Sequence, residues 1–177
     1  SFAAQWLMPR LKHFRALYPE IDVRILASDE RVDFNRHDVD MAIRYGAGNW
    51  PDLVVIPLMT EELFPVCSPA LLRGRHPLEK PEDLVHHTLL HDDLSFENGD
   101  VDWRTWLRTV GADHVVDSER GPFFEHSHLV VQAAIDGQGV ALGRGVLVAD
   151  AMADGRLVRP FDSAGIPLEY AYYIAHP

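Results

Sequence analysis

The segment from Asp38 to Leu53, DVDMAIRYGAGNWPDL, places a cation and a phenol where an apolar strand gives way to a glycine loop. Arg44 and Tyr45 follow the apolar part of the strand, and turn residues come directly after them. A guanidinium can hold a carboxylate through two parallel hydrogen bonds, and a tyrosine adds an apolar wall with a polar tip. The pair therefore fits a binding site for a small acid. An exposed ion pair beside a tyrosine that covers the core is the alternative, and the sequence leaves both open.

Two serines stand just ahead of expected helices. Ser1 precedes FAAQWL, and Ser127 precedes HLVVQAA. A serine in this position can cap the helix through its hydroxyl, and the same free backbone N–H groups also attract anions. Capping is the commoner role for either serine taken singly. Two helix starts that faced each other across a cleft would instead favour a ligand site.

The remaining polar residues form no catalytic set. Asp29 and Asp33 flank a short expected helix, where Asp29 can cap it and Asp33 can receive a ligand amine. The ten histidines include His126 and His128, but no H-E-x-x-H motif occurs and one cysteine cannot build a thiolate zinc cage. No G-x-S-x-G elbow occurs, and GQGVALG follows a helix rather than a strand, unlike a dinucleotide fingerprint. We expect no enzyme and no cofactor, with a histidine metal site as a minority alternative.

The elements that must position these residues alternate between helix and strand. A helix over about 3–18 has Trp6, Leu7, Leu11, Phe14 and Leu17 on one face. After it we expect a strand over 21–26, a short helix over 30–38, strands over 39–46, 53–59 and 62–69, a short helix and then a strand over 79–93, a helix over 102–111, a helix–turn–strand unit over 126–143, a helix over 144–155 and a last strand over 168–177. This alternation predicts an α/β fold with largely parallel sheets, in which ligands bind beyond the carboxyl ends of the strands.

Composition narrows the choice of partner. The chain has 177 residues, 47% of them hydrophobic, and no apolar run approaches the roughly 20 residues of a membrane helix. With 27 acidic and 16 basic residues its net charge is −11, which does not suit a surface that grips phosphate backbones. Cys67 is the only cysteine, so an internal disulfide is impossible and a reducing compartment is the simpler expectation. This chain by itself is therefore not expected to bind nucleic acid or membrane.

Several motifs, in the right order, carry a family resemblance. They are SFAAQWLMPRLKHFRALYPEIDVRI, VDFNRHDVDMAIRYGAGNWPDL, ELFPVCSPALL and HLVVQAAIDGQGVALG. Together they cover nearly the whole chain and resemble the effector-binding domain of LysR-type transcriptional regulators. The resemblance is greatest to the branch that contains the glycine-cleavage activator and the β-lactamase regulator.

The resemblance implies a fold like that of type 2 periplasmic binding proteins, with two Rossmann-like lobes, two crossover strands and a small effector between the lobes. Lobe I would comprise residues 1–64 and 166–177, and lobe II residues 65–165. It implies ligand-binding roles for Ser1, Phe2, Asp33, Arg44, Tyr45, Phe124, His126, Ser127, His128 and Tyr170. Many relatives carry Asp or Ser where this chain has His126 and His128, which leaves the preferred charge of the ligand open.

The resemblance also implies partners. The effector would be an amino acid, a peptide or an organic acid, and the domain would form homodimers, with tetramers of the full-length protein. DNA would be bound in the cytoplasm by a winged helix-turn-helix that this chain lacks, and the first strand of lobe I and the closing C-terminal helix are also expected to be missing. An exported, monomeric solute-binding protein of the same architecture is the alternative.

Overall fold

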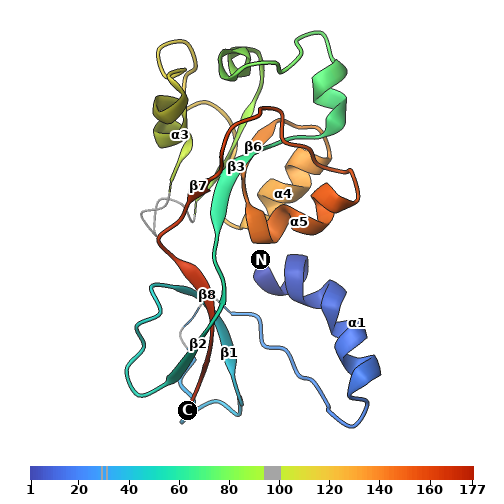
Figure 1. Cartoon of the computed structure of the whole chain (residues 1–177), viewed down its shortest axis with the longest axis vertical. Coiled ribbons are helices and arrows are strands. Elements are labelled where there is room, and N and C mark those ends of the chain that lie inside the picture. The colour runs from blue at the N-terminus through green and yellow to red at the C-terminus, as the bar shows by residue number, and fades with distance from the viewer. Residues whose placement is uncertain (29, 31, 94–100) are drawn as a thin grey trace.

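The strands form two separate sheets in the computed structural model, which describes residues 1–28, 30, 32–93 and 101–177 (Figure 1). We call the three-stranded sheet lobe I, and the five-stranded sheet with its helices lobe II. Two stretches of chain join them, one leading from β2 into β3 and the other from β7 into β8. The predicted α/β architecture of two lobes with two crossovers is confirmed. The residue boundaries assigned to the lobes stay a prediction.

Lobe I is an antiparallel sheet with the order β1-β8-β2. It consists of β1 (Ala42–Gly46), β8 (Ala171–His176) and β2 (Val54–Met59). The central strand is thus the one that comes last in the sequence, with Ala42 of β1 paired to Ala175. Both of the strands that flank it are therefore edge strands among the described residues.

Lobe II is a mixed sheet with the order β5-β4-β6-β3-β7. It consists of β5 (Phe123–Phe124), β4 (Leu89–Asp92), β6 (Val140–Arg144), β3 (Glu62–Val66) and β7 (Ile166–Pro167). Only β5, β4 and β6 run parallel, so the prediction of largely parallel sheets is wrong. The chain passes between the lobes twice, since it enters lobe II along β3 and leaves it along β7. These two neighbouring strands therefore run in opposite directions.

Three helices cover the lobe II sheet, namely α3 (Trp103–Val110), α4 (Ser127–Ile135) and α5 (Gly145–Ala153). Asp102 begins α3, since its carboxylate accepts a hydrogen bond from the Thr105 N–H at 2.8 Å. Gly111 ends the helix with φ of 73°, a left-handed conformation that favours glycine. These three helices confirm the sequence-based expectations, and two 3-10 turns, η2 (Pro69–Arg73) and η3 (Pro81–His86), lie nearby.

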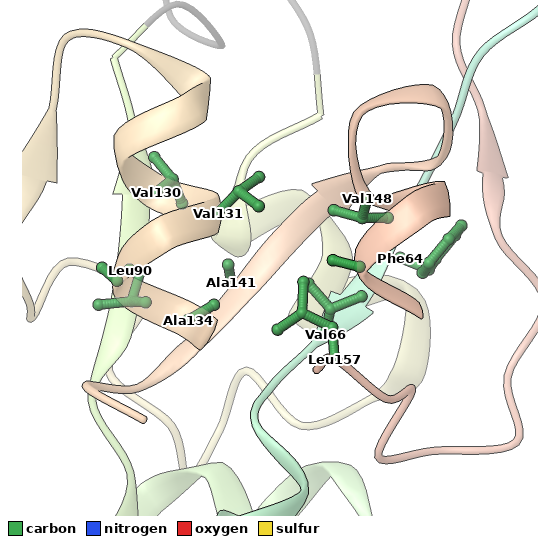
Figure 2. Close-up of a cluster of buried hydrophobic side chains, with 11 residues drawn as sticks. Phe64, Val66, Leu90, Val130, Val131, Ala134, Ala141, Val148 and Leu157 are labelled. Carbon is green, nitrogen blue, oxygen red and sulfur yellow. The ribbon is translucent and has the colours of Figure 1, made fainter. Parts of the chain in front are cut away.

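The hydrophobic core lies in lobe II. Figure 2 shows Val131 and Ala134 of α4 against Ala141 of β6, with Val148 of α5 beside Val66 of β3. A second cluster places Trp103, Trp106 and Leu107 of α3 in the interior. Full burial of one such side chain contributes about 1.5–3 kcal/mol, so lobe II holds most of the stabilising contacts.

The chain begins with a helical segment, η1 (Ala3–Leu7, a π-helical turn) followed by α1 (Met8–Leu17). The expected helix over 3–18 is confirmed, and Pro9, which has no backbone N–H, lies directly after the π-helical turn, a common place for an irregularity in a helix. The apolar face of this helix is covered only in part: η1 and α1 bury no residue fully, Trp6, Leu7 and Leu11 are half-buried, and Phe14 and Leu17 are exposed. The segment contacts α5 of lobe II through η1, as Figure 1 shows near the N-terminus. No helix within the described residues is both long and apolar enough to span a membrane.

Two further expectations fail between α1 and β1. Residues 21–26 form no strand, and Ile21, Val23 and Leu26 are 45%, 42% and 55% exposed. Their alternating pattern is real, but a strand needs a neighbour for its backbone groups, and this segment pairs with neither edge of lobe I. The helix expected over 30–38 is a single turn in its described part, where the Asp33 carbonyl accepts from the N–H groups of Arg36 and His37.

Candidate functional site

Polar side chains gather at the edge where the parallel strands of lobe II end. Phe124, Asp92 and Arg144 are the last residues of β5, β4 and β6, which are neighbours in that order. Ser127, the first residue of α4, donates its hydroxyl hydrogen bond to the Asp92 carboxylate at 2.5 Å. Its hydroxyl is therefore committed to β4 and does not cap the helix. The carboxyl edge predicted to bind ligands thus carries an acid, a hydroxyl and a cation.

Ser1 meets the start of α4. The backbone N–H of His128 donates to the Ser1 hydroxyl oxygen at 3.2 Å, and the same oxygen lies 3.3 Å from His128 Nδ1. The start of the first helical segment and the start of α4 therefore face each other, although they are far apart in the sequence. This is the arrangement that favours a ligand site over simple helix capping.

His126 and His128 form a stacked pair at this helix start. Their ring centroids are 5.5 Å apart and their planes differ by 13°. Desolvation lowers the pKa of His128, and His126 lowers it further because a second positive charge is unfavourable there. His128 is therefore neutral near pH 7 and can exchange hydrogen bonds with Ser1 or a ligand without bringing a charge.

Tyr45 stands in an aromatic group that joins the N-terminal segment to the lobe I sheet. Its ring lies 5.0 Å from that of Tyr172 and 5.8 Å from that of Tyr170. Phe2 packs 4.7 Å from Tyr172 on the side of the N-terminal segment. Three aromatic residues predicted as ligand contacts are thus close together, as an apolar wall would require. Phe124 lies apart, partly buried against the lobe II core.

Arg44 does not share this wall. Arg44 pairs with Tyr173 of β8 and Tyr45 pairs with Tyr172, and successive strand residues point to opposite faces of a sheet. On the Arg44 face, Tyr173 packs against Trp50 and over Gly48, where an added Cβ would lie 2.7 Å from the tyrosine ring. The sequence suggested one site for both members of the pair, whereas the sheet separates their side chains.

Asp29 and Asp33 were predicted as ligand contacts near the first short helix, and the structure describes only Asp33. Asp33 is exposed, accepts a hydrogen bond from the Asn35 N–H at 3.0 Å and lies 3.4 Å from Arg36, so its contacts are local. Asp29 lies outside the described residues. The structure does not bring Asp33 to Ser1, and its ligand role stays a prediction.

Sequence reasoning missed two buried charged residues. Arg144 is buried and places its guanidinium 4.9 Å above the Tyr45 ring, which connects the two lobes. Glu61 is buried at the start of the first crossover, where its Oε1 accepts from the Val146 N–H at 3.1 Å and from the Glu62 N–H at 3.0 Å. Burial raises the pKa of Glu61 most, although hydrogen bonds and Arg144 oppose the shift. A cation at a strand end followed by glycine was the available signal for Arg144, the same signal that identified Arg44.

Two cavities lie elsewhere. One of about 830 Å³ is lined by Glu62 and residues 159–165, and one of about 440 Å³ is lined by Leu11, Arg15, Pro19 and residues 21–23. Neither includes a predicted ligand contact in its lining. Across the part of the chain that the structure describes, no three His, Cys, Asp or Glu side chains are grouped to hold a metal ion.

Comparison of the sequence with known proteins matches the whole chain to one family. The family model described as LysR substrate binding domain matches residues 1–177. The glycine cleavage system transcriptional activator of Escherichia coli is 49% identical over 176 residues, which are 99% of this chain and 56% of that protein. The activator AmpR of Rhodobacter capsulatus is 37% identical over 178 residues, with 100% of this chain and 57% of that protein covered. This chain thus spans about half the length of these curated relatives.

Solved structures agree with the sequence relatives. The effector domain of AmpR from Pseudomonas aeruginosa has a TM-score of 0.73 at 31% identity and covers 99% of this chain and 80% of that one. The AmpR effector-binding domain from Citrobacter freundii has a TM-score of 0.75 at 30% identity, covering 99% and 82%. Both alignments cover 99% of this chain, so the similarity in sequence and in fold includes nearly all of the described elements.

Proposed function

Because the chain belongs to the LysR substrate-binding domain family, in which it is the effector-binding part of a LysR-type regulator, we propose that it binds a small metabolite between its lobes without transforming it. The metabolite contacts Ser1 and the start of α4 on one side and the aromatic wall around Tyr45 on the other. One observation carries the proposal: Ser1 reaches the backbone N–H and the ring of His128 across the space between two helix starts.

The chemistry of this place suits a small polar ligand with an apolar part. The helix start and the Ser1 hydroxyl offer hydrogen-bonding groups that suit carboxylates or amides, and the rings of Phe2 and Tyr45 can pack against carbon atoms. The ring nitrogens of His126 and His128 can exchange hydrogen bonds with such a ligand. An amino acid, a short peptide or an organic acid meets these requirements, and no cofactor is needed.

We further propose a regulatory role for the whole protein, which is supported by its similarity to transcriptional activators. We place DNA contact in a domain outside these 177 residues, homodimerisation in this domain, tetramers in the full-length protein and the action in the cytoplasm. The effector favours one arrangement of the lobes to the extent that it binds that arrangement more tightly. The alternative of an exported solute-binding protein is not favoured by these relatives.

A thermal-shift screen of amino acids, cell-wall peptides and small organic acids tests the proposal. A compound that binds the native state raises the unfolding temperature, and calorimetry then gives its Kd. Ser1→Ala should weaken the binding of that compound, whereas Ser118→Ala, whose hydroxyl donates to the neighbouring Glu119 carboxylate in lobe II, should not. Equal affinity in Ser1→Ala and the parent would count against the site. Recovery of the compound unchanged, checked by mass spectrometry, separates binding from catalysis.

A further inference from the structure

A continuous stack of aromatic rings runs through the proposed site. Trp6 of η1 stacks on Phe2 at 5.1 Å, Phe2 packs on Tyr172 of β8 at 4.7 Å, and Tyr172 packs on Tyr45 of β1 at 5.0 Å. The stack therefore joins the N-terminal helical segment to the lobe I sheet. Phe2 and Tyr45, which form the proposed apolar wall, are two of its four rings.

An arginine closes each end of the stack. The Arg10 guanidinium lies 4.5 Å above the Trp6 ring, and the Arg144 guanidinium lies 4.9 Å above the Tyr45 ring. Arg144 is the residue directly before α5, so this end of the stack is held by lobe II. Cation–ring contacts of this kind are favourable, and more so when the pair is shielded from water, as buried Arg144 is.

The other end is held by the same helix. Arg10 donates two parallel hydrogen bonds to the carboxylate of Asp150 in α5, at 2.9 and 3.0 Å, and a third to the Trp6 carbonyl at 2.9 Å. The ion pair lowers the pKa of Asp150, and Asp150 stays charged at neutral pH. Asp150 of α5 thus contacts the Trp6 end of the stack through Arg10, and Arg144, directly before α5, contacts the Tyr45 end. The four rings between them belong to the N-terminal segment and lobe I.

Because these contacts connect both ends of the stack to α5, we infer that the Arg10–Asp150 ion pair is a latch that holds the N-terminal segment and lobe I against α5. The latch thereby sets how far the lobes close. Both side chains are more than a third exposed, at 40% and 37%, so the latch is weak enough to open and close. Its influence on effector affinity rests on the proposed function, because the effector would touch Phe2 and Tyr45 within the same stack. A pair that held the lobes rigidly would leave nothing for an effector to shift.

The test measures the distance between the lobes without any effector. Spin labels on Val54→Cys in β2 and Arg108→Cys in α3, both exposed positions, report the lobe separation by pulsed electron resonance. Cys67 can remain, because it is fully buried and burial raises its pKa to about 11. Asp150→Asn removes the charge while it keeps the size of the side chain. The matched control is Asp154→Asn, at an exposed carboxylate that pairs with Arg156 two residues further on.

We expect Asp150→Asn to shift the distance distribution to longer values, and Asp154→Asn to leave it at that of the parent. A salt concentration of about 1 M, where the screening length is about 3 Å, should shift the parent in the same direction and leave Asp150→Asn nearly unchanged. An identical distribution in Asp150→Asn and the parent would overturn the latch.

Effector affinity, measured in the same variants, tests separately whether the latch influences binding. If a compound from the screen binds the parent, Asp150→Asn should raise its Kd by roughly 2- to 5-fold, the value of one exposed ion pair. An unchanged Kd together with a shifted distance would overturn the coupling. If no compound binds the parent, the proposed function fails, and the distance measurement decides the latch by itself.

Discussion

Arg44 and Tyr45 are adjacent in the sequence but lie on different faces of the lobe I sheet. Tyr45 belongs to the stack that Arg144 covers, and Arg44 lies on the face of Tyr173. The chemistry of a residue pair can be read from the sequence, since it depends only on side-chain type. Which ligand surface each side chain serves depends on strand alternation and on β8, which arrives from the far end of the sequence.

At the residue scale, Arg44→Ala tests the ligand role that the sequence predicted for a side chain on the sheet face opposite Tyr45. A direct contact with an acidic effector would make the variant weaker by about 1.5–3 kcal/mol, the loss of one hydrogen bond to a charged group. Calorimetry on the folded variant with an acidic compound from the screen measures the change. Arg36→Ala is the matched control, because the Arg36 side chain is 83% exposed and lies 3.4 Å from the Asp33 carboxylate. If Arg44→Ala binds as tightly as Arg36→Ala, the cation plays no part in binding and the ion-pair interpretation of the sequence holds.

Glu61 gives a pH prediction at the same scale. Its pKa is raised in the folded protein by burial, so the native state holds this proton more tightly than the unfolded chain does. The stabilisation is complete below the ordinary value of 4.5 and is lost as the pH rises through the higher folded value. Glu61→Gln keeps an oxygen for the Val146 N–H but cannot ionise, so its unfolding free energy should exceed that of the parent by an amount that grows from pH 4.5 upward.

Urea unfolding at a series of pH values measures this difference. Glu20→Gln, which removes an exposed carboxylate in the turn after α1, corrects for the change in net charge. Parallel stability curves for Glu61→Gln and the parent would show that Glu61 ionises equally well in the folded and unfolded states.

At the scale of elements, the sequence was most informative where all signals for an element are local. The unit over 126–143 has helical spacing, a glycine turn and a short apolar strand, and it folds as α4 and β6. The segment 21–26 has an equally clear alternation but forms no strand, because pairing requires a neighbour that no local pattern can supply. The direction of each strand in lobe II was missed for the same reason, since it is set by the two crossovers.

Helix α3 allows a test of one local signal. Asp102→Ala should lower the unfolding free energy by about 1 kcal/mol, because the Thr105 N–H loses its acceptor at the start of the helix. Asp102→Asn should change it little, since asparagine caps about as well as aspartate. Thermal or urea unfolding of the two variants measures the difference, and equal losses would point to the charge rather than the cap.

At the scale of the whole molecule, the two lobes differ in how much they bury. Both core clusters lie in lobe II, whereas Tyr172 and Ala175 are the buried hydrophobic residues of the lobe I strands. Backbone amides of β6 and α4 should therefore exchange with deuterium more slowly than those of β1 and β2. Hydrogen exchange with peptide-level mass spectrometry checks this order, and equal protection of β1 and β6 would show that the lobes unfold as one unit.

The position of β8 in lobe I has a consequence for biosynthesis. Translation delivers β1 and β2 first, and the strand that must sit between them leaves the ribosome only after all of lobe II has been made. During that interval the two edge strands have no partner for their backbone groups, which makes them a target for chaperones and for pairing with neighbouring nascent chains. The exposed side chains of Val54 and Ile56 on β2 are where such nascent-chain pairing would begin.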